Sequence, residues 1–558
     1  MTDNFKLNVG ARFDGLFFDN SDLLTNGVLQ YAADGSIDES QSSGIIALKY
    51  YPKKYNYQET HIDTGKWPKA GLTISPRVGF SYDVYGDKRL KVRGGTGLFS
   101  GRLPLVFFTN MPTNGGLVQY QAQLNAKKKV WDGKTGKPVA GFENYTGAVT
   151  TDKDGNKFID MDQFKGGLVS DNGTVNINAL YKKLTEMGYP TTVTPKDGVV
   201  PSAVNAVDPN FKMPQVWKTS IAFDYTFPTS FPLTLTGEAV YNKTINAVSI
   251  SDWSIKDVGG FARFNGADNR PIYPANYRNG TAAFVLENTD KGYGWSANVT
   301  LNASTPDRAV EFMAAYTHTV QKEITGMPGS AAESAFTYVS TSEGPNYIKL
   351  HNSQYVTPDR VVASLTHNDK VGNHYSFIYE AWRGGYNYSY MMSNDMNGDG
   401  YNYDAVYIPT DKEVADGEFR FVSDNDRDRF MDYVHASPYL STHQGQYAEA
   451  YSLYNPWVHR VDVSYKHDFN VANHNTLQLC LDVKNVLNIF NSEWGVSKAL
   501  NSALGSDPRI LKYEGIDAEG YATFSTPKAV SGSLETFAPL HALGQCWYAS
   551  VGVKYLFK

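Results

Sequence analysis

Residues 547–558 read WYASVGVKYLFK, a stretch in which apolar and polar side chains alternate residue by residue. Val551 and Val553 belong to one set, and Ser550 and Lys554 belong to the other. Because successive side chains of a strand point to opposite faces, this period of two predicts a strand with one apolar and one polar face. A strand of this kind suits a wall that separates two unlike environments.

The same alternation recurs along the whole chain, beginning with FKLNVGARFD at residues 5–14. We expect about twelve strands in all, an even number, as single-chain outer-membrane barrels have. The ten others lie near 70–85, 90–102, 215–227, 233–250, 292–303, 310–322, 360–367, 374–390, 459–469 and 475–490.

The links between these segments alternate in length. The short links are 86–89, 228–232, 304–308, 368–373 and 470–474. The long links are 19–69, 103–214, 251–291, 323–359, 391–458 and 491–545. Short turns at one end and long loops at the other are typical of a transmembrane antiparallel β-barrel, with periplasmic turns and extracellular loops. A soluble β-sandwich does not sort its loops in this way. The sequence therefore predicts an all-β integral protein of the Gram-negative outer membrane, bounded by outer-membrane lipid.

Composition agrees with a barrel of this kind. Aromatic residues make up 14% of the 558 residues, and there are 49 glycines. Mean hydropathy is only −0.40, because polar loops and a polar inner face dilute the apolar strands. The sequence contains no run of about 18 apolar residues, so it predicts no transmembrane helix. The net charge of −6, with Lys and Arg spread along the chain, excludes a nucleic-acid footprint.

Two cysteines and the first residues bear on the context of the chain. On the strand interpretation Cys480 and Cys546 lie about 20 Å apart, too far for a disulfide, so we expect two free thiols.

Residues 1–20 contain no signal peptide, although an outer-membrane protein requires one. We therefore expect that the sequence is a piece of a longer protein.

Other features concern the loops and the strand ends. The long loop at 103–214 predicts one helix, capped by Asn176, with Ile177, Leu180, Leu184 and Met187 on one face and a stop at Gly188 and Pro190. We expect it to form part of a folded outer lid. Aromatic residues near strand ends fit interfacial girdles: Trp217, Phe227, Tyr293, Trp295, Trp382, Trp457 and Trp547.

Several segments together resemble the TonB-dependent receptors of Bacteroidetes, in particular the Oar-like group that carries a carboxypeptidase-regulatory-like domain. The segments are SPRVGFSYDVYGDKRLKVRGGTGLFSGRLP (75–104), VDPNFKMPQVWKTSIAFDY (207–225), NDMNGDGYNYDAVYIP (394–409), LDVKNVLNIFN (481–491) and the strand at 547–558. The resemblance covers nearly the whole chain.

This resemblance implies a barrel of 22 strands with a plug inside it, of which residues 1–558 would be the last part. It also implies a TonB box and uptake of scarce ligands driven by the TonB system. The plug, the TonB box and the early strands have no counterpart in the sequence, so the TonB system would act through the missing N-terminal part. Lys558 after Phe557 departs from the aromatic residue with which such proteins often end.

The sharpest chemical motif is Asp395-x-Asn397-x-Asp399-Gly400-x-x-x-Asp404. Its oxygen-bearing side chains have the spacing of a calcium loop, and Tyr401 could add its backbone carbonyl. The twelfth position, where such loops carry a bidentate Glu, is Val406. The sequence predicts a structural Ca²⁺ that braces an outer loop, and ordinary turn chemistry is the alternative. A second acidic run, Asp152 to Asp162, has poorer spacing and indicates a solvated loop.

Charged side chains concentrate on the polar side of the predicted strands. We expect these to line the lumen, where opposite charges on neighbouring strands pair across a wet interior. They are Arg12, Asp14, Arg77, Asp83, Lys91, Arg93, Lys218, Asp224, Glu238, Arg460, Asp462, Lys466, Asp482 and Lys484.

The sequence offers little support for catalysis. It contains neither His-Glu-x-x-His nor Gly-x-Ser-x-Gly. The run GGTGLFSG at 94–101 lies in a predicted strand with no helix after it, so its glycines indicate a crowded bend in the wall and not a phosphate loop. We expect no enzyme and no required cofactor.

The sequence thus predicts a receptor barrel whose outer loops capture a ligand for energy-coupled transport. Tyr and Asn in the loops suit a sugar, a peptide or a siderophore-like compound equally well. Two rival functions remain open: a self-standing passive pore, and an adhesin or accessory barrel whose loops hold a partner protein.

Overall fold

The structure is a computed structural model of the 558-residue chain. It describes residues 4–17, 32–38, 50–64, 67–69, 71–113, 128–164, 176–186, 203–327, 329, 331–336, 338–384, 387–471 and 475–557. Among these residues, no helix has both the length and the apolar character needed to cross a membrane.

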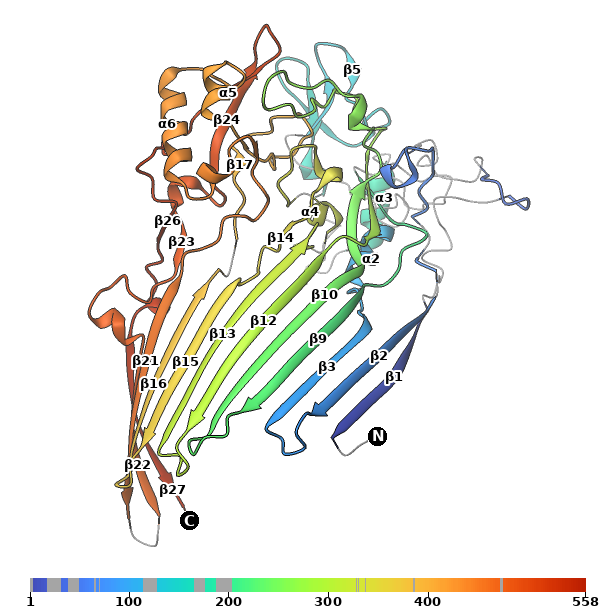
Figure 1. Ribbon diagram of the computed structural model, residues 1–558. Coiled ribbons are helices and arrows are strands. Elements are labelled where there is room, and N and C mark those ends of the chain that lie inside the picture. The colour runs from blue at the N-terminus through green and yellow to red at the C-terminus, as the bar shows by residue number, and fades with distance from the viewer. Residues whose placement is uncertain are drawn as a thin grey trace.

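A single curved wall of twelve long strands dominates the molecule (Figure 1). Each strand is antiparallel to its neighbour in the wall, and the order follows the chain. The strands are β1 (Phe5–Leu16), β2 (Gly71–Asp83), β3 (Leu90–Ser100), β9 (Gln215–Thr226), β10 (Leu233–Asp252), β12 (Tyr293–Ser304), β13 (Val310–Glu323), β15 (Asp359–Asn368), β16 (Asn373–Arg383), β21 (Val458–Asn470), β22 (Thr476–Lys484) and β27 (Tyr548–Leu556). All twelve predicted strands are confirmed.

Two predicted strands end earlier than expected. The segment predicted at 374–390 leaves the wall after Arg383, where Gly384 has a φ of 104°. The segment predicted at 475–490 leaves it after Lys484, where Asn485 has a φ of 51° and a 3₁₀ turn, Val486–Ile489, follows. A residue with left-handed backbone at each of these points ends the hydrogen-bonded pairing of the strand. The alternation of apolar and polar residues does not predict where such a residue occurs.

The short and long links lie at opposite ends of the wall, as predicted. We call these the turn end and the loop end. Both chain termini lie at the turn end (Figure 1). Among the described residues, β1 pairs only with β2, and β27 pairs only with β22.

The ladder registers assign every strand residue to one of two faces. On the apolar face, Val9, Ile221 and Val551 are 73%, 57% and 74% exposed. Exposure of this kind is costly in water and normal against lipid. Trp217 and Trp295 share this face, as expected of girdle residues. Trp382 is a correction, because it pairs with Arg360 on the polar face and its ring packs under the Arg460 guanidinium.

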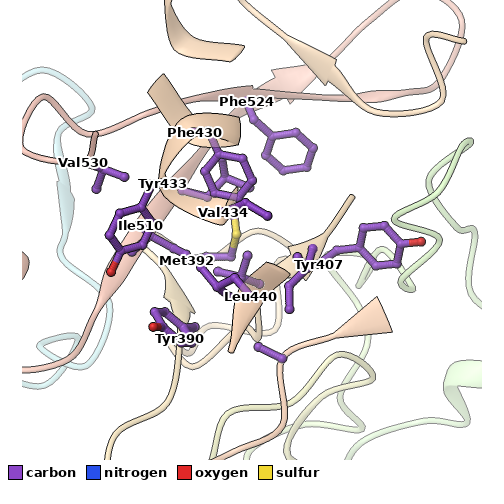
Figure 2. Packing of buried hydrophobic residues seen from close by; sticks show 14 of the residues in the cluster. Tyr390, Met392, Tyr407, Phe430, Tyr433, Val434, Leu440, Ile510, Phe524 and Val530 are labelled. Atoms are coloured by element: carbon purple, nitrogen blue, oxygen red, sulfur yellow. The ribbon is translucent and has the colours of Figure 1, made fainter. Parts of the chain in front are cut away.

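At the loop end the long links fold into a second layer, which we call the cap (Figure 1). Its core joins the links after β10, β16 and β22, and Figure 2 shows Phe430, Ile510 and Phe524 packed within it. The cap contains a sheet of β17 (Met391–Met392), β24 (Arg509–Ile516), β25 (Ala522–Ser525) and β19 (Arg420–Phe421), together with α5 (Asp411–Ala415) and α6 (Asp424–Ala436).

The remaining elements are short or extend the wall at the loop end. They are α2 (Val106–Thr113), β4 (Lys129–Asp132), β5 (Lys137–Pro138), β6 (Val149–Thr151), β7 (Lys157–Ile159), α3 (Ile177–Glu186), β8 (Ala203–Val207), β11 (Ala282–Thr289), α4 (Ala332–Phe336), β14 (His351–Asn352), β18 (Tyr407–Ile408), β20 (Gln446–Tyr447), β23 (Lys498–Leu500) and β26 (Phe537–Pro539), with 3₁₀ turns at Lys53–Tyr55, Met161–Phe164, Val258–Gly260, Pro345–Tyr347, Leu440–Thr442, Ser502–Leu504 and Leu543–Gln545.

The predicted helix is present as α3, and the Asn176 side chain accepts a hydrogen bond from the Ala179 N–H at 3.1 Å. None of its residues is buried, and Ile177 is 57% exposed. Met187, Gly188 and Pro190 lie outside the described residues. The sequence predicts a folded outer lid within 103–214. The largest buried core at the loop end is instead that of the cap, which the links after β10, β16 and β22 form. Cys480 and Cys546 are free thiols, as predicted.

Candidate functional site: the polar face and the cap

The fourteen predicted lumen-lining residues all lie on one face of the wall. Register shows this directly at several points: Lys91 pairs with both Asp83 and Asp224, and Lys218 pairs with Gly97. Since paired residues of neighbouring strands share a face, the predicted set forms one continuous polar surface. We call this surface the polar face. Its role as a lumen lining stays a prediction.

Opposite charges pair on this face. The Arg93 guanidinium lies 3.3 Å from an Asp224 carboxylate oxygen and 4.0 Å from a Glu238 oxygen. Lys484 Nζ donates to Asp462 Oδ2 at 2.9 Å on the far side of the wall. These side chains are partly exposed, so each pair contributes little to stability and mainly sets the local field.

Other cations on the polar face rest on aromatic rings or on backbone. Arg77 and Lys218 lie over the ring of Phe99 at 4.4 and 5.7 Å from its centroid. Arg460 donates through Nε to the Gly495 carbonyl and through Nη2 to Gln545 Oε1, at 2.8 and 2.5 Å. Arg460 therefore ties two parts of the link between β22 and β27 to the wall and is not a free lumen charge.

A hollow of about 530 Å³ lies on the polar face near β1, β2, β3, β9 and β10. It follows a register row of small residues, in which Gly79 pairs with Gly95 and Gly95 pairs with Ser220. Arg77, Lys218 and Glu238 also line it. Small residues leave room at the wall while long charged side chains rise around it, so the hollow suits a polar solute. Sequence reasoning missed it, although the glycines shared the predicted polar face.

The glycines of β3 are required by close approach. A Cβ on Gly94, Gly95 or Gly97 would meet a neighbouring backbone oxygen at 2.8, 2.9 and 2.8 Å. This agrees with the expectation of crowding at this part of the wall. The expectation that no helix follows is wrong, because α2 (Val106–Thr113) is the next element after β3.

The motif residues Asp395 to Asp404 form a tight loop within the cap. Asp395 accepts hydrogen bonds from Gly398 N–H at 2.8 Å and Gly400 N–H at 2.9 Å. Asp399 accepts from Tyr401 N–H at 2.8 Å and from Asn397 Nδ2 at 3.2 Å. Within the described ranges no group of three or more His, Cys, Asp or Glu side chains is arranged to hold a metal. The loop is thus stabilised by its own donors, and calcium stays a prediction.

Asp404, the last residue of the motif, is bound on both oxygens. Its Oδ2 accepts from Met396 N–H at 2.8 Å, and its Oδ1 accepts from Arg270 Nη1 at 3.1 Å. Tyr401 lies nearby with its hydroxyl accepting from Arg278 Nη2 at 2.7 Å. Sequence reasoning missed Arg270, because nothing local marks a partner 134 residues away.

Burial shifts the acidity of these carboxyls. Desolvation is the largest cause that raises the pKa of Asp399 above its ordinary value, and the nearby Asp404 carboxylate adds to it. Desolvation also raises the pKa of Asp404, and the Arg270 charge opposes that rise. Asp399 is therefore the carboxyl of this loop most prone to hold a proton.

A further pocket of about 450 Å³ lies at the loop end between the first long link and the β8–β11 ribbon. Trp67, Trp253 and His61 line it, and the buried Nδ1 of His61 has no hydrogen-bond partner within the part of the chain that the structure describes. A pocket with aromatic rings and an unsatisfied ring nitrogen in its lining suits a small molecule that can hydrogen-bond. Tyr50, in the same link, is fully buried beside the pocket as a core residue.

The second acidic run folds as a hairpin turn. Asp152 Oδ1 accepts from the N–H groups of Asp154 and Asn156 at 2.9 and 2.8 Å. This is the hydrogen bonding of an Asx turn, which agrees with the solvated-loop interpretation.

Comparison with known proteins places this geometry in a family. Residues 1–506 match the outer membrane beta barrel domain family. No curated protein matches the chain. Among solved structures, the outer membrane transporter YddB from Escherichia coli shares 10% identity over 87% of this chain and 41% of its own, with a TM-score of 0.36.

Two further solved structures are similar at the same level. The ferric preacinetobactin receptor BauA from Acinetobacter baumannii shares 9% identity over 88% of this chain and 37% of its own, with a TM-score of 0.32. The ferric enterobactin receptor PfeA from Pseudomonas aeruginosa shares 9% identity over 87% and 40%, with a TM-score of 0.34. The chain spans 37–41% of the length of these three proteins.

Proposed function

Because this chain belongs to the outer membrane beta barrel domain family and is an integral protein of the outer membrane, we propose that it is the ligand-receiving part of a TonB-dependent receptor. In this proposal the cap and the loop-end pocket capture a ligand, and the polar face passes it inward. The segments quoted above favour the Oar-like group of Bacteroidetes. The resemblance also implies that the TonB system would drive this transport.

The observation that carries the proposal is the continuity of the polar face. The hollow beside Arg77 and Lys218 lies on the same face as the Asp462 and Lys484 pair at the other side of the wall. An inner surface that presents polar groups from edge to edge supports movement of a polar solute along it. A purely structural wall would not need a hollow bounded by charged side chains.

The cap supports capture of the ligand before transport. It has its own apolar core, so its outer surface is held rigidly above the wall. Rigid placement of a binding surface lowers the entropy lost when a ligand binds. The ligand class stays open between a sugar, a peptide and a siderophore-like compound.

The first experiment uses the full-length protein purified from the outer membrane and reconstituted in liposomes. Liposome swelling in isosmotic arabinose tests for an open channel. We expect no swelling, because a receptor barrel of this class is plugged. Swelling in arabinose would overturn the receptor proposal and support the passive pore.

A second measurement separates the receptor from an adhesin. The purified periplasmic domain of TonB is immobilised, and retention of the full-length protein is measured. We expect retention, because the proposal has the TonB system drive transport. A closed barrel that TonB does not retain would instead favour the cap as a docking platform for a partner protein.

A further inference from the structure

One lysine and one aspartate from distant parts of the chain meet at the loop end. Lys54 lies in the 3₁₀ turn Lys53–Tyr55 of the first long link, and its ammonium group pairs with the Asp208 carboxylate. Asp208 directly follows β8, and its N–H donates to the Leu286 carbonyl of β11 at 2.9 Å. The Asp208 side chain is 0% exposed and that of Lys54 is 33% exposed. The carboxylate is therefore closed to solvent, while the lysine side chain reaches it from the surface.

The two carboxylate oxygens of Asp208 have different surroundings. Oδ1 accepts from the Tyr55 hydroxyl at 2.9 Å and from the Asn210 N–H at 2.8 Å, whereas Oδ2 faces Lys54. Burial, the largest cause, and the hydrogen bond to Asp208 raise the pKa of Tyr55 to about 12, so its hydroxyl keeps its proton and stays a donor. Two donors that the fold aims at one oxygen are the arrangement that stabilises an oxyanion when the adjoining carbon is attacked.

A second carboxyl, that of Glu287, lies beside the pair. The β8–β11 ladder is parallel, and Asp208 and Glu287 are the residues that follow its last pair on the two chain segments. Residues at matching positions of neighbouring strands point to the same face, so both carboxyls lie on one side of the ribbon. Trp253 Nε1 donates to Glu287 Oε2 at 3.3 Å, and the Trp253 ring packs edge-on against Tyr55 with centroids 5.4 Å apart. The two aromatic rings thus border the carboxyls.

The surroundings of Glu287 favour its protonated form. Desolvation is the largest cause that raises the pKa of Glu287 above its ordinary value, the Asp208 charge adds to the rise, and the Lys54 charge opposes it. A carboxyl that interacts with both charges and holds a proton more readily than usual is suited to carry protons from the amine to the carboxylate. The three side chains thus supply a nucleophile, an electrophile and a proton carrier.

We propose that Lys54 and Asp208 become joined by an intramolecular amide bond, which fastens the first long link to the β8–β11 ribbon. Lys54 passes one proton through Glu287 to Oδ2 of Asp208, and the neutral amine attacks Cγ. The second proton follows the same route, the Cγ–Oδ2 bond breaks, and Oδ2 leaves as water. One ammonium and one carboxylate are thereby replaced by one amide and one water, and Glu287 is unchanged at the end.

Proximity favours this condensation. Well-oriented groups within one molecule react as if present at about 10⁵–10⁸ M. The bond also replaces the buried charge of Asp208 with a neutral amide, which removes the cost of keeping that carboxylate out of water. The bond goes beyond the proposed transport function, because it forms within the loop end whether or not a ligand binds there.

The test is peptide mapping of the full-length protein, purified from outer membranes, unfolded and digested with trypsin. The bond predicts one branched peptide that joins residues 54–66 to residues 197–212 and is lighter than the two separate peptides by one water molecule. We expect this peptide in wild type and its loss in Lys54→Arg, which keeps the cation but does not form the amide. The matched control is Lys53→Arg in the same 3₁₀ turn, since the Lys53 ammonium lies over the Tyr347 ring at 4.1 Å. The control should retain the branched peptide.

A second pair of variants tests the proton carrier. Glu287→Gln keeps the size of the side chain and removes its acid, so we expect the bond to form at least about a hundredfold more slowly. The rate is the yield of branched peptide at fixed times after a pulse of isotope-labelled lysine. Glu59→Gln is the control, because this carboxyl of the same link accepts from the Tyr51 hydroxyl at 3.2 Å and not from the pair. The heat-dependent gel shift of a folded barrel shows that each variant has folded.

Three results would overturn the proposal. Wild type without the branched peptide has an ordinary ion pair at this place. Loss of the peptide in folded Lys53→Arg to the same extent as in Lys54→Arg shows that Lys54 is not the nucleophile. Equal rates in folded Glu287→Gln and Glu59→Gln show that Glu287 does not carry the protons.

Discussion

Arg270 donates from Nη1 to Asp404 Oδ1 across 3.1 Å, and the two side chains are 0% and 2% exposed. Arg270 also binds Asp268 with both Nε and Nη2, at 2.9 and 2.8 Å, and the Ala405 carbonyl at 2.7 Å. The link after β10 is thus fastened to the link after β16 by one buried cation. Such a network fixes one arrangement of the cap, because any other would leave a charge buried without a partner.

Replacing Arg270 with Met should loosen the cap. The change keeps apolar volume but leaves Asp268 and Asp404 buried without their cation, at a cost of about 3–5 kcal/mol. We expect protease cleavage within 391–410 to become faster while the wall stays resistant. The measurement is limited proteolysis of the folded protein, with cut sites identified by mass spectrometry.

Arg427→Ala is the control for that experiment. Arg427 pairs with Asp424 and Asp428 on the surface of α6, where ion pairs contribute little. Equal cleavage rates in the two variants would contradict the role assigned to Arg270.

The wall was predictable from sequence because strand periodicity is local. Each of the twelve strands carries its own alternation, and the order follows from short turns. The cap was not predictable in the same way. Phe264, Phe430 and Phe524 meet in one core from three separate links, and no local pattern marks them as partners. The β2–β3 ladder likewise stops at the Arg77–Gly97 pair, which the alternation on either strand does not reveal.

The cap should become less stable as pH rises. Burial raises the pKa of Asp399 above its ordinary value of 3.8, so the folded cap binds more protons than the unfolded one from about that pH upward. The contribution of Asp399 to the stability of the cap is therefore fully present below pH 3.8 and is lost as pH rises through the raised pKa of this carboxyl. We expect the melting temperature of the cap, followed by near-ultraviolet circular dichroism in chelator, to fall across this window. Asp399→Asn should flatten the slope, and an unchanged slope would contradict the assignment.

Calcium binding by the Asp395–Asp404 loop is tested on the same protein stripped with chelator. Each carboxylate oxygen that accepts one N–H bond keeps a second lone pair for a cation. We expect isothermal titration to show one site of about 10⁻⁴–10⁻³ M, as in extracellular modules. Asp395→Asn with Asp399→Asn should abolish it, whereas Asp152→Asn with Asp154→Asn should not. If wild type releases no heat in this range, the motif is a turn held by its own hydrogen bonds.

The glycines of β3 should limit assembly of the wall. Gly95→Val places a side chain where a Cβ alone would lie 2.9 Å from the Val78 carbonyl oxygen, and backbone in a ladder cannot yield without breaking pairs. Gly10→Val is the matched control, because a Cβ there meets nothing within 4 Å and Gly10 lies on the same polar face. We expect Gly95→Val to lower the folded fraction several-fold in the heat-dependent gel shift and Gly10→Val to leave it unchanged. If both variants fold equally well, the close approach of β2 and β3 is not what selects glycine at position 95.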